Sequence, residues 1–344
     1  MGQNSKIQWT HHTFNHWRGC TKVSPGCANR YAETLSKRNP AVLGVWGDKG
    51  TRVVAAESKW REPLKWDREA KAAGERHRVF CASLADVFED WRGPMVDASD
   101  RTLYDCGDGV WTAAEDVNLR KFPGFCPGND VFAVKMKDVR SRLWELIEET
   151  PHLDWLLVTK RPENVASMLP RHGIPDNVWL GVSAENQEQA DKRIPILLSI
   201  PAKIRFVSCE PMLGPVDFSK WMSCLGISRD ENGSDLGSAS GGSDLDWLIL
   251  GGESGPNARP CNVEWIRQGV KQCREAGVKV FVKQLGARPF WRPKDGPCPI
   301  FPEHVKIKYQ RGYETSEHGI VTRDPKGGEM DEWPDELRVR EVPR

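Results

Sequence analysis

The sequence lacks any long hydrophobic run. No stretch of its 344 residues approaches the roughly 20 consecutive apolar residues that a membrane-spanning helix needs. Its first residues, MGQNSKIQWTHHTF, also lack the apolar region of a secretory signal. We therefore expect a cytoplasmic protein that has no membrane partner.

Three common catalytic motifs are missing as well. The sequence contains no Gly-x4-Gly-Lys-Ser/Thr, which holds phosphates in P-loop proteins, no His-Glu-x-x-His and no Gly-x-Ser-x-Gly. These absences argue against P-loop nucleotide binding and against the common metalloprotease and hydrolase chemistries.

The chain has little net charge, +1 in total, but its charges are unevenly distributed. Residues 1–80 hold 15 Lys and Arg against 7 Asp and Glu, whereas the remaining residues hold 34 against 41. A basic segment attracts phosphate backbones, and tryptophans beside basic residues, as in Trp17-Arg18 and Lys65-Trp66, can stack on bases. Nucleic acid is therefore a candidate partner, and a solvated face of mixed charge is the alternative explanation.

From residue 76 onward, short apolar runs alternate with helical stretches. Six runs rich in β-branched residues end in polar or small residues, and they lie at 77–83, 155–160, 178–183, 204–210, 247–253 and 278–284. Helical patterns at 134–149, 186–199 and 262–276 lie among them, the last followed by Gly277 at a C-cap position. The alternation predicts an α/β fold with a parallel sheet covered by helices.

Polar residues follow each of the six expected strands. The carboxyl ends of parallel strands converge at the mouth of a barrel, whereas in an open sheet only the ends near the switch point do. The pattern therefore favours a partial (β/α)6 TIM-like barrel over residues 1–290. Its mouth would hold a ligand on Lys160, Glu185, Glu210, Gly251, Gly252, Glu253 and Lys283.

Lys160, Arg161 and Lys283 would give this mouth three cations to match its three carboxylates. A ligand with a phosphate or carboxylate group and a hydroxyl or amine would suit it, as a nucleotide or S-adenosylmethionine (SAM) does. A self-neutralising network of ion pairs is the alternative for the charged residues, and a structural turn is the alternative for the two glycines.

Three segments depart from the β/α rhythm. Residues 97–130 and 226–245 are rich in Gly, Asp and either Pro or Ser, which is typical of insertions and loops. Residues 291–344 combine proline, charge and short apolar pieces. We expect them to form an irregular C-terminal extension packed on the barrel, with a hairpin around 304–322.

Ten cysteines raise the question of disulfides or metal ligands. In a chain of this size without an export signal, reduced thiols and metal ligands are expected over disulfides. Cys20 and Cys27 each follow a glycine and have Pro25 between them, which predicts a tight loop that turns two thiols inward. Two ligands are too few for a four-coordinate zinc or an iron–sulfur cluster.

Several motifs in one order resemble a known family. The runs are WRGCTKVSPGCANRYAE, LLVTKRPEN, WLGVSAEN, FVSCEPMLGP, LILGGESGPNARP, FVKQLG and a tail ending in EWPDELRVREVP. They resemble the phage-associated three-cysteine-motif family of unknown function, which is distantly similar to radical SAM enzymes. The resemblance implies a radical-SAM-type barrel, a Cys-x6-Cys-x2-Cys loop that holds a [4Fe-4S] cluster, the use of SAM and a phage-encoded protein partner.

The chain departs from this pattern at the third cysteine, where Arg30 stands. A guanidinium is not deprotonated in proteins and cannot ligate iron, so either the cluster is missing or another group replaces the thiolate. Cys81 and Cys209, at the ends of expected strands, are candidate substitutes, and His16 near the loop is a weaker one. Burial as small apolar residues explains the two cysteines equally well.

Gly251-Gly252-Glu253 resembles the Gly-Gly-Glu with which radical SAM enzymes hold the amino group of SAM. In those enzymes the motif follows an early strand, whereas here it follows the fifth expected one. We therefore do not transfer this role to the three residues.

Three hypotheses follow for the function. The first is a radical-SAM-like iron–sulfur protein of phage or mobile-element type, with Cys20 and Cys27 as cluster ligands, acting on nucleic acid or a nucleotide. The second is a cluster-free barrel that binds nucleic acid or a protein. The third is a barrel whose cysteines hold a structural zinc.

Overall fold

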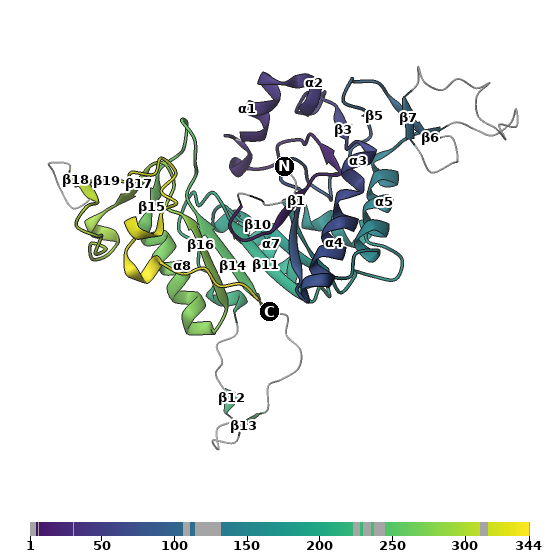
Figure 1. The fold of residues 1–344 in the computed structure, drawn as a ribbon. Coiled ribbons are helices and arrows are strands. Elements are labelled where there is room, and N and C mark those ends of the chain that lie inside the picture. The colour runs from purple at the N-terminus through teal and green to yellow at the C-terminus, as the bar shows by residue number, and fades with distance from the viewer. Residues whose placement is uncertain are drawn as a thin grey trace, which may run out of the picture. The chain divides into compact units, whose positions relative to one another are not determined.

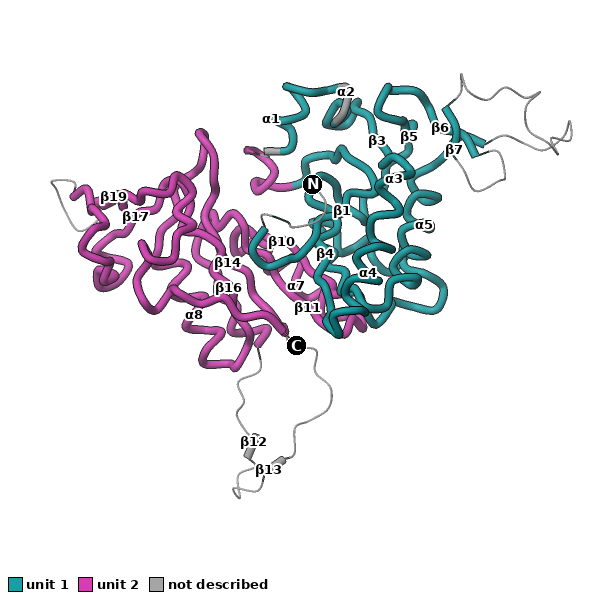
Figure 2. The backbone as a smooth tube through the Cα atoms, in the orientation of Figure 1, with its two compact units in different colours: residues 1–23, 30–178 teal, residues 24–29, 179–344 magenta. Residues whose placement is uncertain are grey.

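The chain is described by a computed structural model, which covers residues 5, 7–29, 31–105, 111–113, 132–222, 228–229, 235–236, 245–309 and 316–343. It divides into two compact units, drawn in different colours in Figure 2. Unit 1 comprises residues 1–23 and 30–178, and unit 2 comprises residues 24–29 and 179–344. Arg30 and most of the two expected insertions lie outside the described residues.

Three parallel strands form the central sheet of unit 1. β4 (His77–Cys81) lies between β1 (His12–Phe14) and β9 (Leu153–Thr159), and Cys81 is level with both Phe14 and Leu157. All seven residues of β9 are buried or nearly so, as a near-continuous apolar run predicts for a strand covered on both faces.

Two long helices support this sheet (Figure 1). α4 (Glu62–Ala73) packs against β4 and β9 and ends at Gly74, which adopts the left-handed conformation. α5 (Met136–Glu148) buries one apolar face, including Leu143 and Ile147, because those side chains recur at helical spacing. The sequence expectation of a helix at 134–149 is confirmed.

Smaller elements complete unit 1. A three-stranded sheet joins β2 (Trp17–Arg18), β3 (Arg52–Val54) and β5 (Met95–Val96), and another joins β6 (Leu103–Asp105), β7 (Trp111–Ala113) and β8 (Phe132–Ala133). The short helices are α1 (Tyr31–Arg38), α2 (Pro40–Leu43), α3 (Glu57–Trp60), α6 (Val165–Met168) and the 3-10 turn Pro162–Asn164. The described part of the expected insertion at 97–130 thus contributes β6 and β7.

Unit 2 holds four parallel strands in the order β10 (Val178–Ser183), β11 (Ile204–Cys209), β14 (Trp247–Gly251) and β16 (Lys279–Gln284). α7 (Gln187–Leu198) packs on β11, and α8 (Val263–Ala276) packs on β14 and β16. Both helices begin at an asparagine whose side chain accepts a hydrogen bond from the first turn, Asn186 from Gln189 and Asn262 from Glu264. Gly277 ends α8 in the left-handed conformation, as expected.

The C-terminal region forms a second sheet and a covering tail. β15 (Cys261–Asn262), β17 (Pro289–Trp291), β19 (His318–Val321) and β18 (Lys306–Lys308) follow one another in that sheet, and the antiparallel pairing of β18 with β19 confirms the expected hairpin. The tail pairs with the outer edge of β16, where the Val282 N–H donates to Val339 and the Glu341 N–H donates to Val280. The Arg340 guanidinium lies over the rings of Phe281 and Trp333.

The remaining elements of unit 2 are short: β12 (Ser228–Arg229), β13 (Asp235–Leu236) and the 3-10 turns Pro25–Cys27, Ser219–Trp221, Pro293–Asp295, Met330–Glu332 and Asp335–Leu337. β12 and β13, an antiparallel pair, are the described part of the expected loop at 226–245.

The α/β class and all six expected strands are confirmed. A seventh parallel strand, β1, was not expected, because only three residues form it and their pattern HTF is too short to read from sequence. The closure into a (β/α)6 barrel and the boundary at residue 290 stay predictions. None of the helices in the described ranges has the length and apolar character that crossing a membrane requires.

Candidate functional site

The first half of the cysteine loop belongs to unit 1. Gly19 links β2 to Cys20 with a φ of +109°, which favours glycine, and a Cβ there would lie 2.5 Å from the Thr51 carbonyl oxygen. Cys20 is 4% exposed and Trp17 is fully buried. The loop therefore turns its first thiol into the protein, as the sequence predicts.

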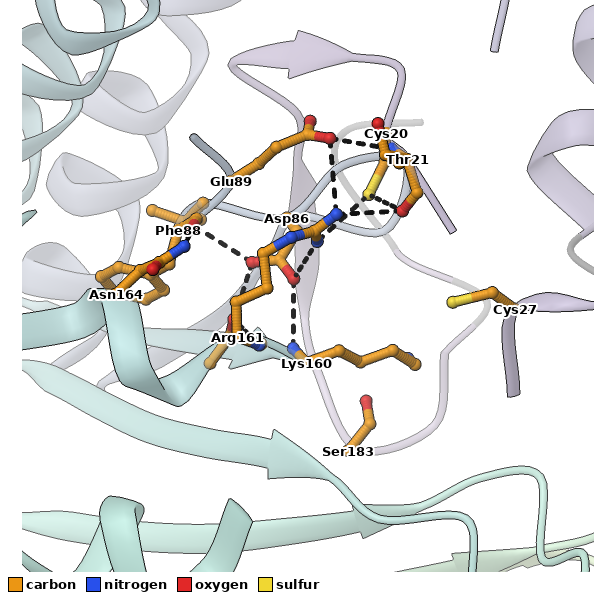
Figure 3. A network of polar contacts seen from close by, with 12 residues as sticks. Cys20, Thr21, Cys27, Asp86, Phe88, Glu89, Lys160, Arg161, Asn164 and Ser183 are labelled. Carbon is orange, nitrogen blue, oxygen red and sulfur yellow. Dashed lines mark hydrogen bonds and ion pairs between the residues drawn. The ribbon is translucent and has the colours of Figure 1, made fainter. Parts of the chain in front are cut away.

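Arg161, which follows β9, fixes this half of the loop (Figure 3). Its guanidinium donates to the Thr21 carbonyl at 3.0 Å and lies 3.6 Å from the Cys20 sulfur. A guanidinium at this distance favours the thiolate form of a cysteine. Arg161 was expected at an open barrel mouth, but it is 7% exposed and its donors are taken by the protein.

Two buried carboxylates hold Arg161 in turn (Figure 3). Asp86 accepts from Arg161 at 2.9 Å, and it also accepts from the Thr159 hydroxyl at 2.8 Å and the Lys160 N–H at 3.1 Å. Glu89 accepts from the Thr21 N–H at 2.8 Å and lies 3.5 Å from Arg161. At Thr21, the backbone N–H of the loop thus donates to Glu89 and the backbone carbonyl accepts from Arg161.

Two further arginines complete this buried network. Arg52 donates to both oxygens of Glu89 at 2.8 Å, and Arg140 donates to the carbonyls of Val87 and Glu89 at 2.8 and 2.7 Å. Three guanidiniums against two carboxylates leave one excess positive charge among these side chains, which a thiolate at Cys20 would neutralise. Burial lowers the pKa of Arg161, but Asp86, Cys20 and Glu89 more than reverse this and raise it.

The second half of the loop, Ser24–Asn29, belongs to unit 2. Glu185, which follows β10 and is 1% exposed, accepts from the Gly26 N–H at 2.8 Å and pairs with Arg193 at 3.0 Å. A Cβ on Gly26 would lie 2.9 Å from the Glu185 carboxyl carbon, so this approach requires glycine. Glu185, expected to bind a ligand, binds the protein's own loop.

Glu253, two residues after β14, also binds the second half of the cysteine loop. Its carboxylate accepts from the Arg259 side chain at 2.6 and 2.9 Å and from the Asn29 amide at 3.0 Å, and Arg259 also donates to the Pro25 carbonyl at 2.9 Å. Burial raises the pKa of Glu253, but the bonds from Arg259 and Asn29 outweigh burial and lower it. Both oxygens of Glu253 therefore accept hydrogen bonds from the protein.

Glu210 and Lys283 pair with each other in unit 2, with 2.9 Å between the ammonium nitrogen and Oε1. The two side chains form an ion pair, and Glu210 Oε1 accepts no hydrogen bond from the described residues. Gly251 lies against it, since a Cβ there would be 3.0 Å from the same oxygen. Gly252 instead packs on backbone, because its Cβ would be 2.2 Å from the Leu285 carbonyl oxygen.

Burial disfavours the thiolate form of both cysteines proposed as substitute ligands. Burial raises the pKa of the Cys81 thiol well above its usual value, and the Cys81 sulfur lies 3.4 Å from Nδ1 of the fully buried His16. Burial, followed by Cys261, Glu185 and Glu210, does the same to Cys209. Burial also lowers the pKa of His16 well below its usual value. These groups fit the interpretation as buried, uncharged side chains.

The described residues do not fit a [4Fe-4S] cluster of the radical SAM type. Such a cluster needs three protein thiolates, and Arg30, at the third position of the motif, lies outside the described residues. Across the described ranges, no three His, Cys, Asp or Glu side chains are grouped as metal ligands. A four-ligand structural zinc site meets the same difficulty.

Several functional positions were missed from sequence. Asp86 and Glu89 follow the end of β4 by five and eight residues. They therefore lie beyond the positions directly after a strand, from which the sequence predicts the site. Arg193 lies six residues after the start of α7, and Arg259 lies in the loop after Glu253. Their pairing with Glu185 and Glu253 agrees with the ion-pair alternative that the sequence also offers.

Comparison with known proteins gives one family. Residues 4–97 and 111–331 match the family described as "Protein of unknown function (DUF5131)". No curated protein matches the chain. Among solved structures, a spore photoproduct lyase variant with a dinucleoside spore photoproduct covers 94% of this chain and 71% of its own, at 11% identity and a TM-score of 0.39. A second variant covers 94% and 72%, at 13% identity and a TM-score of 0.39.

Replacing Arg161 by methionine tests the network. The change leaves Asp86 buried without its arginine partner, while Glu89 keeps Arg52, and we expect a cost of about 3–5 kcal/mol in the free energy of unfolding. Urea denaturation at pH 7 measures it. The exposed Arg92, replaced in the same way, is the control and should leave the free energy of unfolding unchanged. Equal stability of the two variants would contradict the network's role.

Replacing Gly252 by alanine tests the close backbone approach. Because the new Cβ would overlap the Leu285 carbonyl, we expect a loss of about 1–3 kcal/mol, as for other overpacked positions. Gly214→Ala is the matched control, since nothing lies within 4 Å of its Cβ position. A thermal melt in which both variants unfold at the wild-type temperature would refute the packing role.

Proposed function

The chain belongs to the family described as "Protein of unknown function (DUF5131)". From the charges and contacts of its own residues, we propose that it is a cluster-free protein that binds nucleic acid. The binding segment is residues 18–38, which contains the cysteine loop and α1. This is the second of the three hypotheses that the sequence supports.

The charge of this segment carries the proposal. It contains Arg18, Lys22, Arg30, Lys37 and Arg38 but a single carboxylate, Glu33, which leaves an excess of four positive charges in 21 residues. Lys22 and Lys37 share that carboxylate, at 2.6 and 3.6 Å. Lys37 is 76% exposed, and Arg38 is also exposed. An excess of cations, of which Lys22, Lys37 and Arg38 are exposed, is what a phosphate backbone selects.

Arg30 strengthens this charge. Where the three-cysteine motif would place a thiolate, the chain has a guanidinium, so the local charge differs by two units in the direction that favours a polyanion. A substitution that removes a cluster ligand therefore also improves a binding segment for phosphate.

The anchoring of the loop supports binding as well. Glu89 and Arg161 hold the Thr21 backbone, and Arg52 holds the Thr21 hydroxyl at 3.0 Å. Lys22 follows directly. A binding segment that is held in place in the free protein loses less conformational entropy when it binds.

An iron–sulfur protein is the second candidate. The burial of Cys20 and Cys27 and the guanidinium beside Cys20 favour it, since thiolates are the ligands of such clusters. The missing third thiolate is the reason that we place it second. For both candidates we also propose that the protein is encoded by a phage or mobile element. Its partner would then be nucleic acid, a nucleotide or a phage-encoded protein.

Removing two exposed cations should weaken nucleic-acid binding. We expect Lys37→Gln with Arg38→Gln to lower the slope of log affinity against log salt by about 1.8 for duplex DNA, because each lost phosphate contact contributes about 0.9. Fluorescence anisotropy with labelled duplex and single-stranded DNA at several salt concentrations measures this slope.

The double variant Lys65→Gln with Lys71→Gln on α4 is the control, since it removes the same charge and should keep the wild-type slope. If wild-type protein binds neither form of DNA at low salt, the proposal is wrong and a protein partner takes its place. If both double variants lose the same slope, the contact is a general charge effect and the assignment to residues 18–38 fails.

Restoring the third thiol tests the cluster. After anaerobic reconstitution, the Arg30→Cys variant should bind about four irons per chain, the content of a [4Fe-4S] cluster. Wild-type protein should bind far fewer. Iron analysis and visible absorption measure both. Adding Cys20→Ser to Arg30→Cys should abolish the gain. Wild-type protein with the full iron content would establish the second candidate in place of the first.

A further inference from the structure

Three histidines gather where β1 and β4 begin, in unit 1. His12 Nε2 and His77 Nδ1 are 3.1 Å apart, and the ring of His11 stacks on that of His77 with 5.0 Å between centroids. The ring of His12 lies flat on Trp66 of α4, at 4.4 Å and 4°. His12 is 3% exposed, whereas His11 and His77 are partly exposed, and the cluster lies at the opposite end of the strands from Cys81.

The contacts of the cluster depend on unprotonated ring nitrogens. His11 Nδ1 accepts a hydrogen bond from the Arg78 N–H at 2.7 Å, which an imidazolium cannot do. The contact between His12 and His77 holds only while one of the two facing nitrogens lacks a proton. Two of these contacts therefore break when all three rings carry a charge.

The charged groups around the cluster do not compensate for such protonation. Arg78 of β4 adds positive charge beside His11. The Asp154 carboxylate of β9 pairs with Arg76 at 2.7 Å, and the Asp67 carboxylate of α4 accepts from the His152 N–H at 2.7 Å. Glu75 lies 3.9 Å from His77 Nε2 but is 70% exposed. Each carboxylate is thus either engaged or in solvent.

The titration of the rings agrees with this geometry. Burial, followed by the positive charge of His77 and His11, lowers the pKa of His12 to about 4. Burial, Arg78 and His77 lower the pKa of His11, and Glu75 and Asp154 offset only part of the decrease. Because the folded pKa values lie below the ordinary 6.5, the neutral rings stabilise the folded cluster, and this stability is lost as pH falls from about 6.5 towards 4.

We propose that His11, His12 and His77 form an acid-operated latch, which holds β1 on β4 while His11 and His12 are neutral and releases β1 when these two rings are protonated. Within unit 1, β1 is an edge strand whose partner is β4. It leads to Asn15, whose side chain accepts from the Leu84 N–H at 2.7 Å, and Leu84 in turn accepts from the Gly19 N–H before the cysteine loop. Release of β1 therefore loosens the entry to that loop.

Hydrogen exchange at the backbone amides of β1 tests the latch in the full chain. After correction for intrinsic chemistry, we expect opening to increase at least about tenfold between pH 6.5 and 5, because each ring that protonates only on release contributes up to about tenfold per pH unit. The amides of β11 should not change. The variant His12→Phe with His77→Phe keeps aromatic volume against Trp66 and should reduce the increase to the part that His11 alone contributes.

His172→Phe is the matched control, since this exposed histidine pairs with Glu148 and should leave the wild-type response intact. A wild-type strand whose opening does not depend on pH, or a double variant that responds like wild type, would overturn the latch.

If the double variant does not fold, NMR titration of the wild-type ring protons decides the question. The latch requires His11 and His12 to titrate below their ordinary value, together with the loss of protection in β1. Titration at or above that value refutes it.

Discussion

The contact between Arg161 and the backbone of Thr21 is the interaction on which the cysteine loop depends. A loop without regular secondary structure has backbone groups that need partners once they are buried, and here charged side chains supply them. Buried charges are costly unless they are paired, so Arg161 requires Asp86 and Glu89, and Glu89 requires Arg52. In unit 2, Glu185 and the Glu253–Arg259 pair bind residues 25–29 in the same way. Strand-end charges that resemble a ligand site therefore serve the loop.

The sequence predicts the fold class better than the site, and the reason is physical. Apolar runs such as 247–253 report burial directly, so each expected strand appears within a few residues of its predicted position. The C-cap residue Gly277 acts locally, so the end of α8 could be predicted from it. β1 could not be predicted from its local sequence, because its three residues are stabilised by β4 and Trp66, which lie 50 to 70 residues away in the chain.

The site was harder because a carboxylate looks the same in sequence whether it meets a ligand or an arginine. Glu185 and Glu253 stand out in the sequence as strand-end acids, but their partners, Arg193 and Arg259, lie on elements whose orientation only the fold determines. The same applies to Asp86, which is separated from Arg161 by 75 residues. Arg30, by contrast, could be recognised from the motif alone, since a guanidinium differs from a thiolate in charge and in donor chemistry.

The tail that covers β16 has a consequence for synthesis. Residues 339–341 complete the edge of a sheet whose strands are all made earlier, and the indole of Trp247 also donates to the Glu341 carbonyl at 2.9 Å. Until those residues leave the ribosome, the backbone of β16 presents unpaired donors and acceptors to other nascent chains. Protection of this edge during translation thus depends on how quickly residues 285–341 follow β16 out of the ribosome.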